Sequence, residues 1–500
     1  MSARDRAIRS LCVVGAGAVG LSAALAFARS LPGLRVTILD TPSDPAALAD
    51  RTIACLPTIH RFHASIGLDE LGLVREGIAL HHLGTRFENW SASGAAWFHV
   101  FGDYGLPAAA VPFHQLWAQL RRADGAEPYD RYAAAASLAE AGKFVHPTDD
   151  TGSPLSSYLY GLRLDPEKYR ARLLEDAQKR RFEIVTGELA GIERRQDGGI
   201  ATLRLGDGGG IEADLYLDCA GPSAPLRSAI DQDFDDWSDC LPCDRVAFAP
   251  PRAALSSLPY DRQKASTDGW IWACTLPGSE AFGAAWSSGS SDDAQALQSL
   301  REMAGTTDSP TVTIRPGRRL EPWKYNVLAI GDSAVTVDPL HSTHLHLAHS
   351  FIQRALELIP GRDCHRLELA EFNRRTADET ARVRDFLALH YLRSGRTEGE
   401  FWKAAARGRM PDSLAHTLDQ FETRGRLPFF EEETFNQESW LAVLIGLGVI
   451  PRNADPASDR VDLKRAESSM AQLAAALAEL PARLPEYGDY LDRMRGPQPA

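Results

Sequence analysis

Four histidines that could bind a metal or transfer protons lie close together in one segment of the sequence. His341, His344, His346 and His349 fall within nine residues of each other. Neutral imidazoles bind transition metals, and an imidazole that titrates near about pH 6.5 suits general acid–base chemistry. If a helix begins near residue 343, His346 and His349 lie about one turn apart on one face. Metal binding, proton transfer and packing are therefore the three roles to be distinguished.

A glycine-rich loop near the N-terminus predicts a dinucleotide-binding site. A short apolar run there is followed by G-x-G-x-x-G spacing and then by a helical pattern, with the loop formed by Gly15, Gly17, Ala18 and Gly20. Such glycines allow a tight turn, close approach of a pyrophosphate and packing of the helix on the strand. The helix start adds free N–H groups and a positive dipole end. Asp40 ends the next apolar run, where a ribose-binding carboxylate is expected.

A later motif indicates that the dinucleotide is FAD. The apolar run 327–330 leads into Gly331 and Asp332, and Pro339 follows a few residues later. In many flavoproteins an aspartate in this setting holds the ribityl chain of the flavin. The sequence contains no second G-x-G-x-x-G motif that could bind NADPH. We therefore expect electrons to arrive from a separate NAD(P)H-dependent flavin reductase.

Composition and charge exclude several classes of protein. The chain has 500 residues, of which 44% are apolar and 24% charged, as is ordinary for a globular enzyme with an ample core. The net charge of −13 disfavours a nucleic-acid partner, because binding would require neutralisation of phosphates. We find neither a long apolar run nor a signal-peptide pattern, so we expect a cytoplasmic protein without a membrane partner. The seven dispersed cysteines fit reduced thiols.

The elements that must position these residues alternate between helical and strand patterns. Residues 165–180 predict a helix, 182–221 predict a β-meander, and 266–290 predict strands rich in tryptophan. We expect residues 1–345 to form an FAD-binding and β-sheet region that also contributes substrate-facing segments. Residues 346–500 are expected to form a mostly helical substrate and C-terminal module. Because the dinucleotide elements are far apart in the sequence, the domains must interleave.

Several segments together resemble the flavin-dependent tryptophan halogenase family. TDGWIWACTLPG, with Trp270 and Trp272, is similar to the family's Trp-x-Trp-x-x-Pro signature, although two extra residues precede the proline. AWFHVFG, with His99 and Phe101, resembles the segment with which that family sandwiches an indole. Further similar segments follow in the family's order over essentially the whole chain, among them ADLYLDCAG, VDPLHST and ETFNQESWLAVLIGLGVIP.

The resemblance implies an α/β fold. A Rossmann-type FAD-binding domain, similar to that of the GR2 class of flavin monooxygenases, is interleaved with a β-sheet and a mostly helical substrate module. It also implies a reaction in which FADH2 reacts with O2, halide is oxidised to hypohalous acid, and a lysine and a glutamate assist halogen transfer to an indole or another aromatic substrate. Residues expected to contact that substrate are His99, Phe101, Trp270 and Trp272. The oligomeric state stays open, and a homodimer is compatible with the sequence.

The sequence departs from the family at both catalytic positions. In ALHHLG the family's lysine position holds His82, and in PLHSTH the glutamate position holds His341. Losing one charged partner alone would leave a buried, unpaired charge. Replacing both partners leaves the net charge of the site unchanged, because two neutral imidazoles and a lysine–glutamate pair both have a net charge of zero. We therefore predict His82 and His341 as the catalytic residues.

Two neighbouring departures concern halide and metal binding. His344 replaces the glycine of a Thr-Gly step that binds halide in the family, and TIACLP at 52–57 replaces a flavin-flanking loop. Halide use therefore stays open. His346 and His349 are expected to pack or cap. We assign no metal ligand, because flavin chemistry needs no metal and no acidic residue lies between His341 and Ser350.

The predicted function is that of an FADH2- and O2-dependent halogenase or monooxygenase-type oxidoreductase acting on an aromatic compound. One alternative is a flavin monooxygenase that hydroxylates without halide on the same scaffold. Another is a flavin-binding protein without turnover, and a third is a plain FAD oxidoreductase that binds nicotinamide. Halide dependence separates the first two functions, and formation of any product separates both from a non-catalytic protein.

Overall fold

The computed structural model describes residues 7–51, 54–108, 111–123, 125–254, 256–306 and 309–496. Two units alternate along the chain, each built from three stretches. The first unit consists of Met1–Leu73, Leu164–Ser238 and Val312–Ala381. The second consists of Val74–Arg163, Asp239–Thr311 and Arg382–Ala500. The interleaving expected from the sequence is thus present, and the expected division at 345/346 falls inside a stretch that belongs to the first unit.

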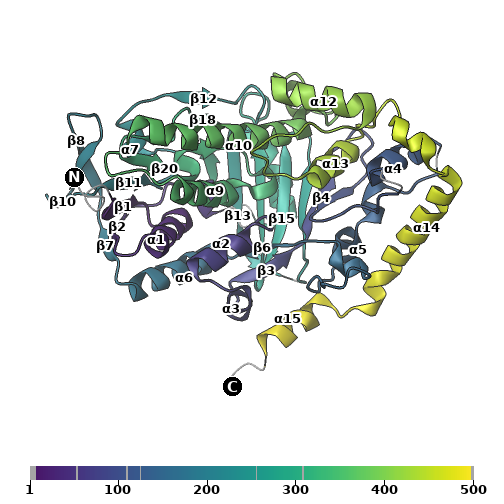
Figure 1. Cartoon of the computed structure of the whole chain (residues 1–500), viewed down its shortest axis with the longest axis horizontal. Helices are drawn as coiled ribbons and strands as arrows, with labels where there is room; N and C mark the ends of the chain where they lie inside the picture. The colour runs from purple at the N-terminus through teal and green to yellow at the C-terminus, as the bar shows by residue number, and fades with distance from the viewer. Residues whose placement is uncertain are drawn as a thin grey trace. The chain divides into compact units, whose positions relative to one another are not determined.

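The first unit is organised around a six-stranded sheet (Figure 1). Its order is β19 (Trp323–Lys324), β20 (Val327–Ala329), β11 (Leu215–Asp218), β1 (Ser10–Val14), β2 (Arg35–Asp40) and β7 (Glu183–Thr186). The pairs from β20 to β7 are parallel, and only β19 pairs antiparallel. Strands of such sheets are covered on both faces, which explains continuous apolar runs such as Leu11–Val14. This is the Rossmann-type arrangement that the sequence predicts.

Helices pack against this sheet and against each other. The helix α1 (Ala18–Ser30) contacts both α6 (Pro166–Lys179) and α9 (His344–Glu357). The α6 helix begins as its sequence predicts, since the Asp165 side chain accepts the Lys168 N–H and proline occupies the first helical position. The shorter helices of this unit are η2 (Leu48–Asp50), α2 (Ile59–Ile66), α7 (Pro225–Ser228), η5 (Gly331–Ser333) and η6 (Leu340–Ser342).

Two small antiparallel sheets complete the first unit. One contains β8 (Leu189–Arg194), β9 (Ile200–Leu205) and β10 (Gly210–Ile211), and the other contains β12 (Phe234–Asp236), β18 (Gly317–Arg319) and β21 (Val335–Thr336). The expected meander is therefore divided. Its middle strands form a separate sheet, whereas β7 and β11 join the nucleotide sheet on either side of β1 and β2.

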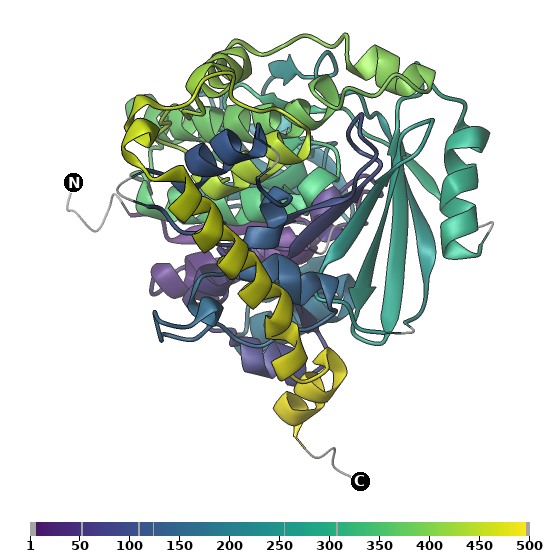
Figure 2. The same cartoon turned by 90° about the vertical axis from the view of Figure 1, so that its right-hand side faces the viewer.

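The second unit contains a larger, mostly antiparallel sheet whose long strands Figure 2 shows in teal. Successive neighbours are β13 (Arg245–Ala253), β16 (Ser279–Trp286), β15 (Trp270–Leu276), β14 (Asp261–Ala265), β4 (Gly84–Glu88) and β5 (Trp97–Val100). The helix α8 (Asp293–Ala304) packs against β13 and β16. A separate two-stranded ribbon pairs β3 (Ala79–His82) with β6 (Gly161–Leu164). The tryptophan-rich strands predicted between 266 and 290 are β15 and β16.

The rest of the second unit is mainly helical. Its helices are α4 (Phe113–Arg121), η3 (Tyr129–Tyr132), α5 (Ala134–Glu140), α11 (Glu400–Ala405), α12 (Asp412–Arg424), α13 (Gln437–Gly446), α14 (Leu463–Glu479) and α15 (Tyr487–Arg495). Four of the described elements contain residues of both units: β6, the short helix α3 (Glu70–Arg75), the short strand β17 (Thr311–Thr313) and the long helix α10 (Arg366–Leu392). Among the described residues, no helix combines the length and the apolar character that crossing a bilayer requires.

Candidate active site

The G-x-G-x-x-G loop has the backbone geometry that its glycines predict. Gly15 follows β1 with a φ of 100°, and its N–H donates to the Leu39 carbonyl over 3.0 Å. A Cβ at Gly15 would lie 2.5 Å from the backbone oxygen of Cys219, and a Cβ at Gly20 would lie 1.9 Å from the Gly15 oxygen. Both contacts are with backbone, which cannot move aside. Side chains are therefore excluded at these two positions.

The start of α1 attracts a carboxyl group. Asp50 accepts the Val19 N–H over 3.3 Å, and a Cβ at Gly17 would lie 2.1 Å from its Oδ2 atom. Burial raises the pKa of Asp50, although the N–H groups of Val19 and Ala18 oppose this. An acidic group at this position shows the affinity for anions that a helix start provides. Asp50 carries no signal in the sequence, because it lies far from the glycine loop and belongs to no motif.

Asp332 provides a buried acceptor for a hydroxyl group. Its Oδ2 atom accepts the Ala49 N–H over 2.8 Å, whereas Oδ1 has no hydrogen-bond partner among the described residues. Burial raises the pKa of this carboxyl group to about 8. A buried polar oxygen without a partner is costly, and a ribityl hydroxyl, which can both donate and accept, would satisfy it in either protonation state. The Ser333 hydroxyl steadies the loop by donating to the Gly221 carbonyl over 2.8 Å.

The predicted FAD-binding residues all belong to the first unit, and most of them follow the carboxyl ends of its parallel strands. Gly15 follows β1, Asp40 ends β2, and Gly331 follows β20. Ligands of open α/β sheets bind at this edge. The Asp40 carboxylate lies 3.5 Å from Arg170, and Pro339 precedes η6. These residues fit FAD. Thr52 and Ile53 of the altered flavin-flanking loop lie outside the described residues.

The backbone at His341 is strained. His341 and Ser342 have φ values of 59° and 50°, so two consecutive residues with side chains adopt the left-handed conformation. Each such residue costs on the order of 1–2 kcal/mol. His341 is 7% exposed. Strain of this kind collects at functional sites, which is consistent with the role predicted for His341.

Two of the other three histidines pack inside the first unit. The His344 ring lies 2.9 Å from the Val337 carbonyl, to which its Nε2–H can donate, and burial lowers its pKa to about 4. His349 stacks on Phe62 with ring centroids 3.6 Å apart, and burial lowers its pKa well below the usual range. Both rings are therefore neutral at pH 7. The packing predicted for His349 is present, and the His344 ring is tied to a neighbouring carbonyl.

His346 belongs to a charged network instead of simply packing. Its Nδ1 atom lies 2.9 Å from the Thr58 hydroxyl, and its Nε2 atom lies 3.6 Å from Glu379. Glu379 also accepts from Arg354 over 2.9 Å and from the Ser350 hydroxyl over 2.8 Å. Burial alone would raise the pKa of Glu379, but His346, Arg354 and Ser350 together lower it to about 2. The carboxylate is therefore ionised and fully paired.

In the second unit, His82 is paired with an acid. This residue ends β3 and is 3% exposed. Its Nε2 atom lies 3.4 Å from Oδ2 of Asp261, the first residue of β14. Oδ1 of Asp261 lies 3.2 Å from the guanidinium of buried Arg163. His82 thus belongs to a triad of charged and titratable groups, which the argument from two neutral imidazoles did not include. Asp261 and Arg163 carry no motif that could have identified them.

Aromatic rings surround His82 and His99. Phe101 meets the His82 ring edge-on at 5.5 Å and the His99 ring at 5.8 Å. Phe386 and Phe435 stack on each other at 3.7 Å and lie 6.0 and 6.3 Å from His99. Burial lowers the pKa of His99 to about 3, so this ring is neutral. The structure thus brings together His82, His99 and Phe101, and it adds two phenylalanines that the sequence analysis missed.

Trp270 and Trp272 belong to a neighbouring aromatic cluster on β15. Trp270 is 1% exposed, its indole N–H donates to the Tyr391 hydroxyl over 2.9 Å, and its ring lies 5.6 Å from Trp90. A Cβ at Gly283 would lie 2.0 Å from the Trp272 ring, so this glycine makes room for the indole. Their contact with a substrate stays a prediction, and so does the facing of His82, in the second unit, and His341, in the first.

Comparisons with known proteins agree with this architecture. The family model described as tryptophan halogenase matches residues 10–463. Tryptophan 7-halogenase KtzQ of Kutzneria sp. (strain 744) is 29% identical, over 98% of this chain and 99% of the relative. Tryptophan 7-halogenase RebH of Lentzea aerocolonigenes is 26% identical, over 90% and 91%.

Solved structures of flavin-dependent halogenases have the same fold. BrvH from Brevundimonas sp. BAL3 is 32% identical with a TM-score of 0.91, covering 98% of this chain and all of that one. Another, from Xanthomonas campestris, is 27% identical with a TM-score of 0.90, over 99% of this chain and 100% of that one. With the glycine loop, Asp332 and the two-unit fold in place, the chain belongs to the tryptophan halogenase family and is an FAD-dependent oxidoreductase that uses FADH2 and O2.

Proposed function

We propose that this protein halogenates an indole-type aromatic compound, with His82 and His341 acting at the positions that match the family's lysine and glutamate. A separate NAD(P)H-dependent reductase supplies FADH2. The observation that carries the proposal is the His82–Asp261 pair, 3.4 Å apart and bordered by Phe101. This pair provides a buried group with exchangeable protons at the position that matches the family's lysine.

The first unit holds the cofactor. Bound FADH2 and O2 supply the oxidising equivalents that convert halide into an electrophile. The N–H groups at the start of α1 would hold the pyrophosphate, and Oδ1 of Asp332 would form a hydrogen bond with a hydroxyl of the ribityl chain. The strained backbone at His341 follows Asp332 in the same unit, after the short strand β21.

His82 handles protons at the substrate. The Asp261 carboxylate, 3.4 Å from Nε2, favours the tautomer that carries its proton on Nε2, which leaves the lone pair on Nδ1. That atom can accept a hydrogen bond from hypohalous acid, or take the proton that an aromatic ring loses after halogenation. Arg163 balances the charge of Asp261, so the pair does not depend on a protonated histidine for neutrality.

The aromatic lining suits a flat, neutral ring. His99 is neutral because burial lowers its pKa to about 3, and Phe101, Phe386 and Phe435 add apolar faces and edges. Offset stacking and edge-to-face contacts with such rings favour an indole or a phenol. The proposal therefore extends to small aromatic compounds as well as to tryptophan itself.

The test is one assay with two arms. The purified protein, FAD, a flavin reductase and NADH are incubated with tryptophan, indole and a small phenol panel, once with bromide and once without halide. We expect a mass gain corresponding to one bromine only in the bromide arm. A gain of one oxygen in both arms would identify a hydroxylase and overturn the proposal, and so would hydrogen peroxide as the only product across the panel.

A further inference from the structure

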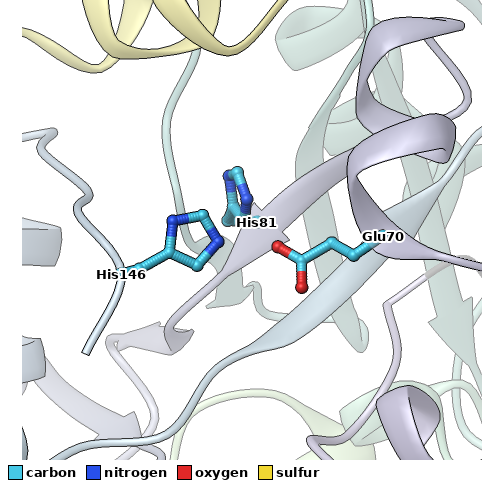
Figure 3. A group of neighbouring side chains, drawn as sticks. All are labelled: Glu70, His81 and His146. Atoms are coloured by element: carbon cyan, nitrogen blue, oxygen red, sulfur yellow. The ribbon is translucent and has the colours of Figure 1, made fainter. Parts of the chain in front are cut away.

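A second pair of histidines lies in the second unit, away from the residues assigned to catalysis. His81 precedes His82 on β3, and His146 lies in the loop that follows α5 (Figure 3). Successive side chains of a strand point to opposite faces, so His81 faces away from the His82–Asp261 pair. The two rings are perpendicular, with centroids 5.0 Å apart, and their ligand nitrogens lie within 4.8 Å of one another.

Both imidazoles are held by tyrosines of one helix. The Tyr487 hydroxyl lies 3.0 Å from His81 Nδ1 and also accepts the His81 backbone N–H over 2.8 Å. The Tyr490 hydroxyl lies 2.6 Å from His146 Nδ1 and accepts the His146 backbone N–H over 3.3 Å. Because Nδ1 of each ring is engaged, Nε2 is the nitrogen that each ring would present to a ligand.

The surroundings orient the rings further and leave one side accessible. Phe144 stacks on His81 at 4.0 Å, and Tyr160 meets the two imidazoles edge-on at 5.7 and 5.4 Å. His81 is fully buried, whereas His146 is partly exposed. His146 is therefore the member of the pair that solvent partly reaches, whereas packing fixes the position of His81.

We propose that His81 and His146 bind a borderline divalent cation such as Zn²⁺ through their Nε2 atoms, with water completing the coordination. Neutral imidazole is a preferred ligand of such ions, and hard cations such as Mg²⁺ prefer oxygen. Ligating histidines bind a second group through their other nitrogen, which fixes the ring and the tautomer. Tyr487 and Tyr490 occupy that place for both rings. Packing explains the stacked Phe144, but it does not require two hydroxyls of one helix on two Nδ1 atoms.

This cation would join three parts of the second unit. It would connect β3, the loop carrying His146 and, through the tyrosines, the helix α15. Because His82 follows His81 directly, the site would restrain the strand that carries the proposed catalytic histidine. That consequence rests on the proposed function, whereas cation binding itself does not.

The test measures binding directly and needs no substrate. Full-length protein without a histidine tag is treated with chelator, dialysed and titrated with Zn²⁺ by calorimetry. A second sample of the metal-free protein receives Co²⁺, and the visible absorption of the bound Co²⁺ is recorded. We expect one Zn²⁺ per chain, a Co²⁺ spectrum typical of nitrogen and water ligands, and no heat from Mg²⁺.

Three variants locate the site. His146→Ala should weaken Zn²⁺ binding at least about tenfold, because it removes one of two protein ligands. Tyr490→Phe should weaken it about tenfold, the usual effect of losing a group that orients a metal-binding histidine. His416→Ala, at an exposed histidine of α12, is the matched control and should leave binding unchanged.

Several results would overturn the proposal. They are no Zn²⁺ binding to the wild-type protein, equal binding to wild type and His146→Ala, or an equal loss in His416→Ala. Circular dichroism verifies that each variant is folded, and His146→Gln replaces His146→Ala if the alanine variant is not. Because binding is read by heat and absorption, failure here is distinguishable from failure of the halogenation assay.

Discussion

The nucleotide site of the first unit and the aromatic site of the second differ in how they are built. Around FAD, the decisive features are backbone conformations at Gly15, Gly20 and Gly331, together with a helix start. Around His82, they are side chains that β14 and other separate segments bring together, as Asp261 shows. A backbone conformation of this kind tolerates few residue types. In a cluster of side chains, by contrast, individual residues can be substituted while the fold is maintained. The glycine loop of the first site follows the family's pattern, whereas at the second site we propose that His82 stands at the position of the family's lysine.

The largest effect is expected from a substitution in the glycine loop of the FAD site. Gly15→Ala adds a Cβ 2.5 Å from the Cys219 oxygen at a φ of 100°. We expect loss of FAD binding by at least about a hundredfold and loss of all product, because the loop must shift. Fluorescence titration with FAD measures this. Gly33→Ala is the matched control, since its φ is 86° but no atom lies within 4 Å of the added Cβ. Equal losses in both variants would contradict the steric explanation.

The next effect separates the two sites. His82→Gln removes the titratable group and keeps a side chain of similar size. We expect product formation to fall by about 10²–10⁴, the usual contribution of a general acid or base, while FAD affinity is unchanged. Product mass and FAD titration read the two sites independently. His82→Lys, which restores the family's residue, should recover part of the activity. A His82→Gln variant with full activity would remove His82 from the mechanism.

A third prediction concerns the charged network behind the nucleotide loop. Glu379 has a pKa of about 2 in the fold against 4.5 ordinarily, so it stabilises the fold above about pH 4.5 and loses this effect as pH falls toward 2. Glu379→Gln should lower the free energy of unfolding by about 3 kcal/mol at neutral pH, because Arg354 loses its buried partner. The deficit should shrink between pH 5 and pH 3. Urea unfolding at several pH values measures it, and a deficit independent of pH would contradict the assignment.

The contribution of Asp332 to the stability of the fold should depend on pH with the opposite sign to that of Glu379. Its pKa in the fold is about 8 against 3.8 ordinarily, so the protein without cofactor loses stability as pH rises from about 4 to about 8. Asp332→Asn removes this penalty. In the absence of FAD, the stability advantage of the variant over wild type should increase by an amount on the order of 2 kcal/mol from pH 5 to pH 7. Thermal unfolding of the wild-type and variant apoproteins at pH 5 and at pH 7 measures this difference. An equal difference at both would show that Asp332 is ionised throughout.

The smallest effect is expected at His349. Its ring stacks on Phe62, and Nε2 has no hydrogen-bond partner among the described residues. His349→Phe preserves the stack and removes an unsatisfied polar atom. The free energy of unfolding should change by no more than about 0.5 kcal/mol, and halogenation should be unchanged. A large loss of activity would show that this imidazole has a chemical role that the packing does not reveal.

The same contrast decides what the sequence could predict. The glycine loop, Asp40 and Asp332 could be proposed from the sequence because a few neighbouring residues make up each motif. The family could be identified as well, since its segments follow one another along the chain. Asp261, Arg163 and Phe435 could not, because none carries a motif and each depends on long-range strand or helix packing. The divided meander escaped prediction for the same reason, since alternating apolar residues do not specify which sheet a strand joins.

Among the histidines, spacing alone was a poor guide to role. His344 and His349 are neutral and packed, whereas His346 is part of an ion network with Glu379. Only their contacts distinguish them: His344 meets the Val337 carbonyl, His349 stacks on α2, and His346 lies beside α10. His341 differs from all three through its backbone, which no residue pattern in the sequence indicates.

We propose that FADH2 and O2 in the first unit supply the oxidising equivalents and that His82 directs them to the aromatic substrate. The most direct measurement is the amount of brominated indole formed per FADH2 consumed, in wild type and in His82→Gln. We expect equal consumption of FADH2 in both proteins and a sharp fall of the ratio in the variant, with the missing equivalents recovered as hydrogen peroxide or free hypobromous acid. An unchanged ratio would contradict this proposal.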